Sequence, residues 1–321
     1  RNTFSINGGA KLNERLKIDG MMNYTGTKGF NRPEQGYGDN SLAQKFFQWG
    51  QRQLDYNELK SYINQDGTQR TWNRSSYDDP TPMYSDNPYW TVYKNYSDDK
   101  RNRFFGNVKL QYNITDDLFV VGNAYGDQYD FKIRERVAVH SQAQSSYSET
   151  NFQNAEYNFE ARLHYNKRFN NFSLNSFAGV NKRRVTYSEL GGFTSGGLIL
   201  PNLYNLANSV NPSQSYNRQS KMTVNSIYGM VSLGYRDLLF VEGTIRKDYF
   251  STVPEAGVYP GVTGSFIFSQ LMTESNWLSF GKIRASWAQV SNGANPYSLK
   301  NYYNIGLPFN GTPTYGLNST S

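Results

Sequence analysis

A strict period of two between residues 157 and 169 constrains this chain more than any other feature. Tyr157, Phe159, Ala161, Leu163 and Tyr165 alternate with polar or charged side chains, among them Glu160, Arg162 and His164. This period is typical of a β-strand whose two faces have different surroundings. Asn170 and Asn171 follow, and the alternation restarts at Phe172, so the sequence predicts a β-hairpin here.

The same alternation recurs along the chain and predicts an all-β fold with antiparallel strands. The expected strands, about ten in number, lie near 2–9, 15–27, 101–114, 117–137, 150–169, 171–187, 216–236, 238–251, 261–273 and 277–291. The links between them alternate in length, with long ones at 28–100, 138–149 and 188–215. Short turns at one end of a sheet and long loops at the other are typical of outer-membrane β-barrels.

Composition excludes several other classes of protein. Aromatic residues make up 16% of a chain that is only 37% hydrophobic, which fits neither a disordered chain nor an ordinary soluble core. No apolar run is long enough for a membrane-spanning helix. There is no cysteine, and His140 and His164 have no ligand-like spacing, so we expect no metal site and no cofactor. No catalytic constellation is visible, and we expect neither an enzyme nor a nucleic-acid-binding protein.

The cost of burying charge decides which face of each strand meets lipid. An arginine facing hydrocarbon at the bilayer midplane costs about 2–4 kcal/mol. We therefore expect Tyr157, Phe159, Leu163 and Tyr165 to face lipid and the polar residues to line a wet lumen. An aromatic girdle is expected at the short turns, formed by Tyr112, Phe119, Tyr165, Phe169, Phe172, Tyr235 and Trp277. The alternative is a soluble sheet with its apolar face on a core.

The link at 28–100 is expected to be a folded surface loop, with a short helix after Asp55. Its far end is rich in aromatic rings, which stack well on sugars and peptide side chains. These rings either contact a ligand or a partner protein, or they pack the loop against the barrel wall. They belong to Tyr84, Tyr89, Trp90, Tyr93 and Tyr96.

Two groups of cations have two interpretations each. Lys132, Arg134 and Arg136 are opposite in phase to Phe119 and Val121, which predicts that they lie on the lumen face. There they contact substrate or pair with neighbouring acids. Lys182 and Arg184 share the phase of the apolar residues but lie above the apolar band. They contact phosphates of lipopolysaccharide, or they are solvated charges.

Several segments resemble a known family in the same order along the chain. The chain is similar to SusC/RagA-type TonB-dependent transporters of Bacteroidetes outer membranes in five stretches, which read RNTFSINGGAKLNERLKIDGMMNYTGTKG, QWGQRQLDYNELKSYINQDGTQRTWNR, NPYWTVYKNYSDDKRNRFFGNVKLQYNITDDL, YFSTVPEAGVYPGVTGSFIFS and WLSFGKIRASWAQVSNGANPYSL. The resemblance implies a barrel of about 22 strands, filled by a plug, covered by a SusD-like lipoprotein and driven by TonB. Residues 1–321 would then be part of that barrel domain, with the plug and the remaining strands outside the chain.

The expected function is therefore the TonB-dependent import of oligosaccharides or oligopeptides across the bacterial outer membrane. The expected partners are the SusD-like lid, the TonB complex acting through the plug, lipopolysaccharide and the cargo. Two alternatives stay open: a passive porin or structural barrel, and a soluble β-rich glycan-binding module.

Overall fold

The protein is a curled antiparallel sheet in a computed structural model that describes residues 1–32, 34, 36–272, 278–299 and 301–318. Within these ranges the main sheet has ten strands in the order of the sequence, each paired with the next. A separate two-stranded sheet joins β11 (Tyr302–Ile305) to β12 (Tyr315–Asn318). The main strands are β1 (Asn2–Lys11), β2 (Leu16–Phe30), β3 (Asp98–Asn113), β4 (Leu118–Val137), β5 (Ser146–Phe169), β6 (Phe172–Leu198), β7 (Ser209–Tyr235), β8 (Leu239–Phe250), β9 (Gly257–Phe266) and β10 (Ile283–Ala288).

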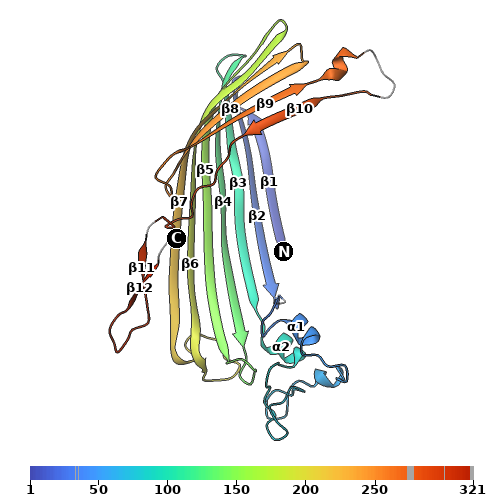
Figure 1. The fold of residues 1–321 in the computed structure, drawn as a ribbon, viewed down its shortest axis with the longest axis vertical. Helices are drawn as coiled ribbons and strands as arrows, with labels where there is room; N and C mark the ends of the chain where they lie inside the picture. Colours follow the sequence, from blue (N-terminus) through green and yellow to red (C-terminus); the bar gives the residue numbers. More distant parts are fainter. Residues whose placement is uncertain (33, 35, 273–277, 300, 319–321) are drawn as a thin grey trace.

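The long strands run side by side and the sheet curls at one edge. Figure 1 shows β1 to β7 along the long axis of the molecule, with β8, β9 and β10 inclined to them. β1 and β10 are the two edges of the sheet, since each pairs with one neighbour in the described part of the chain. No helix in the described ranges is both long and apolar enough to cross a membrane.

The predicted strands are confirmed from β1 to β8, whereas β9 lies at 257–266 and not at the predicted 261–273. The links are sorted by length from β1 to β8, but the link from β9 to β10, at the short-turn end, covers 267–282 and is long. Phe169 pairs with Phe172 across the Asn170–Asn171 turn, and Asn170 has a positive φ of 46°, a conformation that asparagine tolerates. β6 and β7 extend further than predicted, so the link between them shortens to 199–208. The predicted strand at 277–291 is only 283–288, and Trp277 lies outside the described residues.

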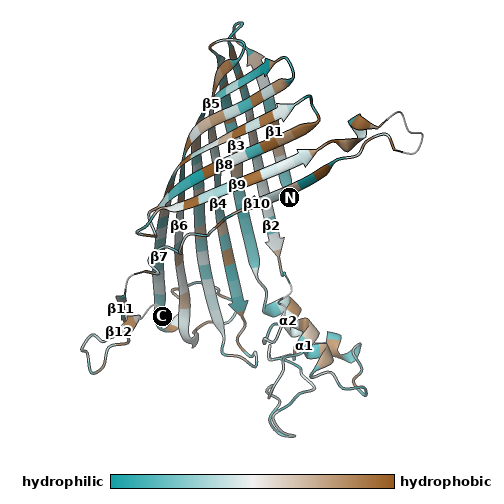
Figure 2. Ribbon diagram, turned by 45° about the horizontal axis from the view of Figure 1, so that its top comes forward, coloured by the Kyte–Doolittle hydropathy of each residue, from teal (hydrophilic) through white to brown (hydrophobic). Residues whose placement is uncertain are grey.

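The register divides the sheet into an outer face, which contains Phe159, and an inner face, which contains Glu160. Leu110, Ala124, Val180 and Ile227 share the outer face with Phe159, because they occupy the same phase in successive strand pairs. Phe159 is 55% exposed, whereas Asn123 on the inner face is 6% exposed. Inner side chains crowd together, as expected on the concave side of a curled sheet. Figure 2 shows apolar and polar residues interspersed along the same strands.

The outer apolar band has the height that a bilayer requires. On β5 it runs from Tyr157 to Tyr165, consistent with the roughly 9–11 residues of a tilted strand that cross the hydrocarbon. β5 has 24 residues, so it extends well beyond the band on the side of the long loops. At the short turns the rings of Phe172 and Tyr235 lie 5.0 Å apart on the outer face.

The register corrects the predicted faces of β4. Phe119 pairs with His164, and their rings stack 4.7 Å apart on the inner face, so Phe119 does not belong to the outer girdle. Lys132, Arg134 and Arg136 have the opposite phase and therefore lie on the outer face, not on the lumen face. The error has a physical cause: residues 118–121 are all apolar, so the sequence there carries no period of two.

The link at 31–97 is a folded module at the long-loop end of the sheet (Figure 1). It contains α1 (Leu42–Phe47), capped by Ser41, and α2 (Pro88–Lys94), capped by Asn87. The helix predicted after Asp55 is only a short 3-10 turn, Glu58–Lys60. Asp55 instead accepts a hydrogen bond from the amide of Asn57 at 2.8 Å, which closes a local turn.

The face assignment predicts different costs for the same arginine placed on opposite faces. In the full-length protein, Leu163→Arg should lower the free energy of unfolding by about 2–4 kcal/mol, because the guanidinium meets hydrocarbon. Asn175 is an exposed residue on the inner face of β6, the strand paired with β5. Asn175→Arg should change the free energy of unfolding by less than about 1 kcal/mol. Urea unfolding of protein inserted in lipid vesicles measures both values. Equal losses would contradict the assignment.

Candidate functional site

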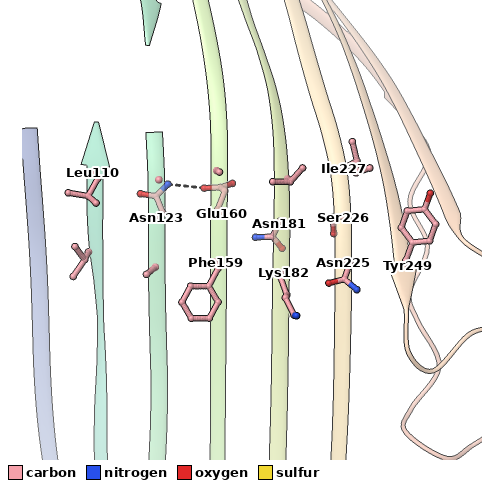
Figure 3. Close-up of a pocket in the computed structure, with 15 residues that line it drawn as sticks. Leu110, Asn123, Phe159, Glu160, Asn181, Lys182, Asn225, Ser226, Ile227 and Tyr249 are labelled. Carbon is pink, nitrogen blue, oxygen red and sulfur yellow. Dashed lines mark hydrogen bonds between the residues drawn. The ribbon is translucent and has the colours of Figure 1, made fainter. Parts of the chain in front are cut away.

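The inner face carries a cluster of polar side chains at the level of the apolar band. Glu160 is its centre: it accepts a hydrogen bond from Asn123 Nδ2 at 2.9 Å and another from the Tyr228 hydroxyl. Arg162 Nε lies 3.5 Å from Glu160 Oε2. Figure 3 shows Asn123 and Glu160 joined across β4 and β5, with Phe159 next to Glu160 in sequence. These contacts hold the charged side chains in place on the inner face, directly opposite the apolar side chains of the outer face.

A second cation extends the cluster onto β8. Arg246 Nε donates to Asp248 Oδ1 at 2.8 Å, and its Nη2 donates to Ser226 Oγ at 2.8 Å. Its guanidinium also lies 5.3 Å from the ring centre of Tyr228. The inner polar cluster therefore spans β4, β5, β7 and β8, and it consists of Asn123, Glu160, Arg162, Ser226, Tyr228, Arg246 and Asp248.

Nearer the long loops, two bidentate ion pairs continue the inner wall. Arg183 donates to both carboxylate oxygens of Glu156, at 2.6 and 2.9 Å. Arg103 forms the same kind of pair with Asp127. Paired charges on a wet surface bind polar groups through hydrogen bonds without presenting one large electric field of a single sign. Such a wall suits the passage of polar cargo better than tight binding of one ion.

His164 is held by aromatic packing. It lies between Phe119 and Phe177, with ring centres 4.7 and 5.3 Å away. In the part of the chain that the structure describes, no group of three or more histidine, aspartate or glutamate side chains is placed to hold a metal ion.

Buried polar groups lock the 31–97 module onto the neighbouring loop at 138–145. Asp86 Oδ1 accepts hydrogen bonds from Gln69 Nε2 at 2.7 Å and from the Gln142 amide at 2.6 Å. Asn95 Oδ1 accepts from the Ala138 amide at 2.8 Å and from the Ser141 hydroxyl at 2.9 Å. Asp86 is fully buried, so these bonds are not exchanged with water. We call this set the loop latch.

Burial shapes the ionisation of the loop latch. Burial raises the pKa of the Asp86 carboxyl, against the hydrogen bonds from Gln69 and Gln142 that favour its charged form. Burial also lowers the pKa of the nearby Lys45 ammonium, against the attraction of Asp86. Lys45 is only 3% exposed, so its charge acts within the module and is not offered to a ligand. No sequence pattern pointed to Asp86 or Lys45.

A cleft opens where the 31–97 module meets the ends of β4 and β5. It has a volume of about 780 Å³ and is lined by Arg32, Glu34, Glu135 and Ser148, among other mostly polar residues. Glu135 and Ser148 share the inner face, so the cleft continues the inner wall toward the long loops. We call it the mouth cleft. Sequence analysis missed it, because its walls come from segments far apart in the chain.

The structure separates the aromatic residues that were predicted to act together. Trp90 is 2% exposed, and its Nε1 donates to Ser141 Oγ at 2.9 Å, so Trp90 belongs to the core of the module and does not contact cargo. Tyr84 and Tyr93 are more than half exposed. Tyr84 stacks on Trp49 and Tyr93 stacks on Tyr62, with ring centres 5.5 and 5.4 Å apart. Tyr89 lies half-buried in α2.

The three cations near the end of β4 pair with neighbouring acids, which was the second interpretation of the sequence. Lys132 Nζ lies 2.6 Å from Glu149 Oε1, and Arg134 Nε lies 3.1 Å from Glu149 Oε2. Arg136 is nearly buried and binds Asp98 at 2.6 Å, with its guanidinium over the ring of Tyr96. Glu149 lies in β5 and Asp98 in β3, so these ion pairs join neighbouring strands, and the contact of Arg136 with Tyr96 reaches the base of the 31–97 module.

Comparison with known proteins identifies the architecture. No family model matches the chain, and no curated protein sequence matches it. A solved structure of the RagAB peptide transporter matches 99% of this chain with a TM-score of 0.77 and 15% identity. Structures of the RagAB peptide importer in its open-open and closed-closed states match with TM-scores of 0.75 and 0.74, at 15% and 14% identity.

At this identity the likeness shows the fold alone: the chain folds like a section of the RagAB chain. The matched region is 36% of the RagAB chain, so this chain spans about a third of the length of the transporters it matches. All three structures are of a peptide transporter or importer.

The loop latch predicts that Asp86 holds two loops together. Asp86→Ala leaves the partly buried Gln142 amide and Asn95 Nδ2 without an acceptor, at about 1–3 kcal/mol for each unpaired donor. Hydrogen exchange at 138–145 should accelerate by at least tenfold. Asp86→Asn, which keeps one acceptor oxygen, should accelerate it less, and Asp78→Ala on the exposed surface should leave it unchanged. Unchanged exchange in Asp86→Ala would contradict the latch.

Proposed function

We propose that this chain is part of the barrel of a TonB-dependent outer-membrane importer for oligopeptides or oligosaccharides. The observation that carries the proposal is the opposition of the two faces: an apolar band on the outer face, and charged, hydrogen-bonded residues on the inner face. A soluble sheet needs an apolar face covered by protein, whereas here Phe159, Leu163 and Ile227 are all exposed. The likeness to RagAB supports transport as the purpose of this arrangement.

In this proposal the long loops face the outside of the cell and the short turns face the periplasm. Further strands continue the sheet from β1 and β10 and close it, because an unpaired strand edge in hydrocarbon leaves backbone groups without partners. A plug fills the lumen and contacts TonB. The paired charges of the inner wall then bind the plug or passing cargo through hydrogen bonds.

The partner proposed for the loops is a SusD-like surface lipoprotein. The loop latch supports this, because it makes the 31–97 module rigid enough to receive a partner with little loss of entropy. Tyr84, Tyr89 and Tyr93 are the residues proposed to contact the lid or the cargo, and Tyr84 and Tyr93 offer exposed rings. Cargo admitted by the lid would pass the mouth cleft before it reaches the inner wall.

The proposal predicts energy-dependent uptake. Cells carrying the full-length protein should import a fluorescent oligopeptide or oligosaccharide pool, and loss of TonB should reduce that import to the level of cells lacking the protein. The control is a small sugar that enters through porins, whose uptake should not change. Import that persists without TonB would refute energy coupling and favour a passive porin. Detergent-free solubility of the intact protein would instead favour the soluble glycan-binding module.

A further inference from the structure

The outer face has a shallow apolar groove within its lipid-facing band. Its volume is about 680 Å³, and it crosses β3 to β8. Gly122 and Ala161 form its floor because their side chains are absent or small, and Leu110, Phe159 and Ile227 stand beside them. Figure 3 shows Leu110, Phe159 and Ile227 on separate strands around this depression. A groove of this kind accepts an extended hydrocarbon chain, which a flat band would leave mobile.

Two cations stand on the outer face at the end of the groove nearest the long loops. Lys182 lines the groove and occupies the same level as Phe159 and Asn225, as the register and Figure 3 both show. Arg184 follows on the same face, level with Tyr157. Both side chains are exposed. Among the described residues neither has an ion pair or hydrogen bond to another side chain.

Lys182 and Arg184 differ from the arginine between them, which does have a partner. Arg183 lies between these two residues in sequence, points to the inner face and is fully paired with Glu156. At the levels of Lys182 and Arg184, the outer face of β3 to β8 carries no carboxylate: its residues there are Gly106, Val108, Ala124, Gly126, Tyr157, Phe159, Thr223, Asn225 and Tyr249. Within the described strands β3 to β8, the outer face therefore supplies no anion to this pair of cations.

We propose that this groove and its two cations form a binding site for one phosphorylated glycolipid of the lipopolysaccharide class. One acyl chain lies over Gly122 and Ala161, and a phosphate of the head group binds Lys182 and Arg184, with Asn225 as a further donor. The charges lie at the edge of the apolar band, where a membrane places its head groups, and the complementary charge there is negative. The cations lie at the long-loop end, so the leaflet is the outer one.

The inference rests on membrane insertion but not on transport, so it stands or falls independently of cargo import. A lipid held at this point contacts β4 to β8 together, and these strands carry the inner polar cluster on their opposite face. Binding would therefore support the same section of wall from outside.

Two variants separate the head-group contact from the acyl contact. Lys182→Gln combined with Arg184→Gln removes both charges and keeps a polar side chain at each position. Gly122→Leu fills the groove and keeps the charges; a Cβ at Gly122 meets no atom within 4 Å, so the fold accommodates it. The matched control is Lys28→Gln with Lys100→Gln, two cations on the outer face that lie further toward the long loops.

The measurement is the number of lipid A molecules retained by the purified full-length protein, counted by native mass spectrometry, followed by titration with lipid A or phosphatidylglycerol. Folding is checked by heat-modifiable migration on gels. We expect at least a tenfold weaker lipid A affinity in the double glutamine variant and in Gly122→Leu, and no change in the control. Equal retention in the glutamine variant would overturn the site. Unchanged affinity in Gly122→Leu would overturn the acyl contact, and equal affinity for phosphatidylglycerol would overturn the assignment to lipopolysaccharide.

Discussion

The structure depends on one constraint: each strand separates hydrocarbon from water across the thickness of a single sheet. In hydrocarbon every backbone amide and carbonyl must find a partner within the protein, which the continuous antiparallel pairing of β1 to β10 provides along each pair. The side chains must then obey the period of two, because a shift by one residue would turn Arg162 into the membrane and Leu163 into the lumen. Strand length, the sorting of loops and the two faces all follow from this constraint.

Cationic side chains have different surroundings in each part of the molecule. On the inner wall, arginines form bidentate pairs or share acids, as Arg183 does with Glu156. At the base of the long loop, Arg136 is nearly buried between Asp98 and aromatic rings and serves as an anchor. On the outer face, Lys182 and Arg184 pair with no acid among the described residues. The same residue type thus pairs with acids on the inner wall, attaches a loop, or stands unpaired on the described outer face, according to its surroundings.

Much of the fold could be predicted from sequence where the alternation was clean, as it was in β5. The prediction failed in β4, where Phe119 and Val121 are as apolar as their neighbours. There the face of each residue follows from the pairing of Phe119 with His164, whose rings stack. The prediction for the aromatic residues of the loop failed for a related reason. Composition does not distinguish Trp90, which is buried against Ser141, from Tyr84, which is exposed on the surface. The loop latch and the mouth cleft had no sequence signal, since their residues come from distant segments.

By itself the sequence determined that this chain forms long antiparallel strands with one apolar and one polar face, because side-chain direction in a strand depends only on local position. The tertiary structure decided what each polar residue does. Pairing register brought Glu160 to Tyr228 and placed Lys182 between Phe159 and Asn225, and loop packing brought Asp86 to Gln142. These outcomes depend on distances between remote segments, which are fixed only when the sheet curls and the loops fold against it.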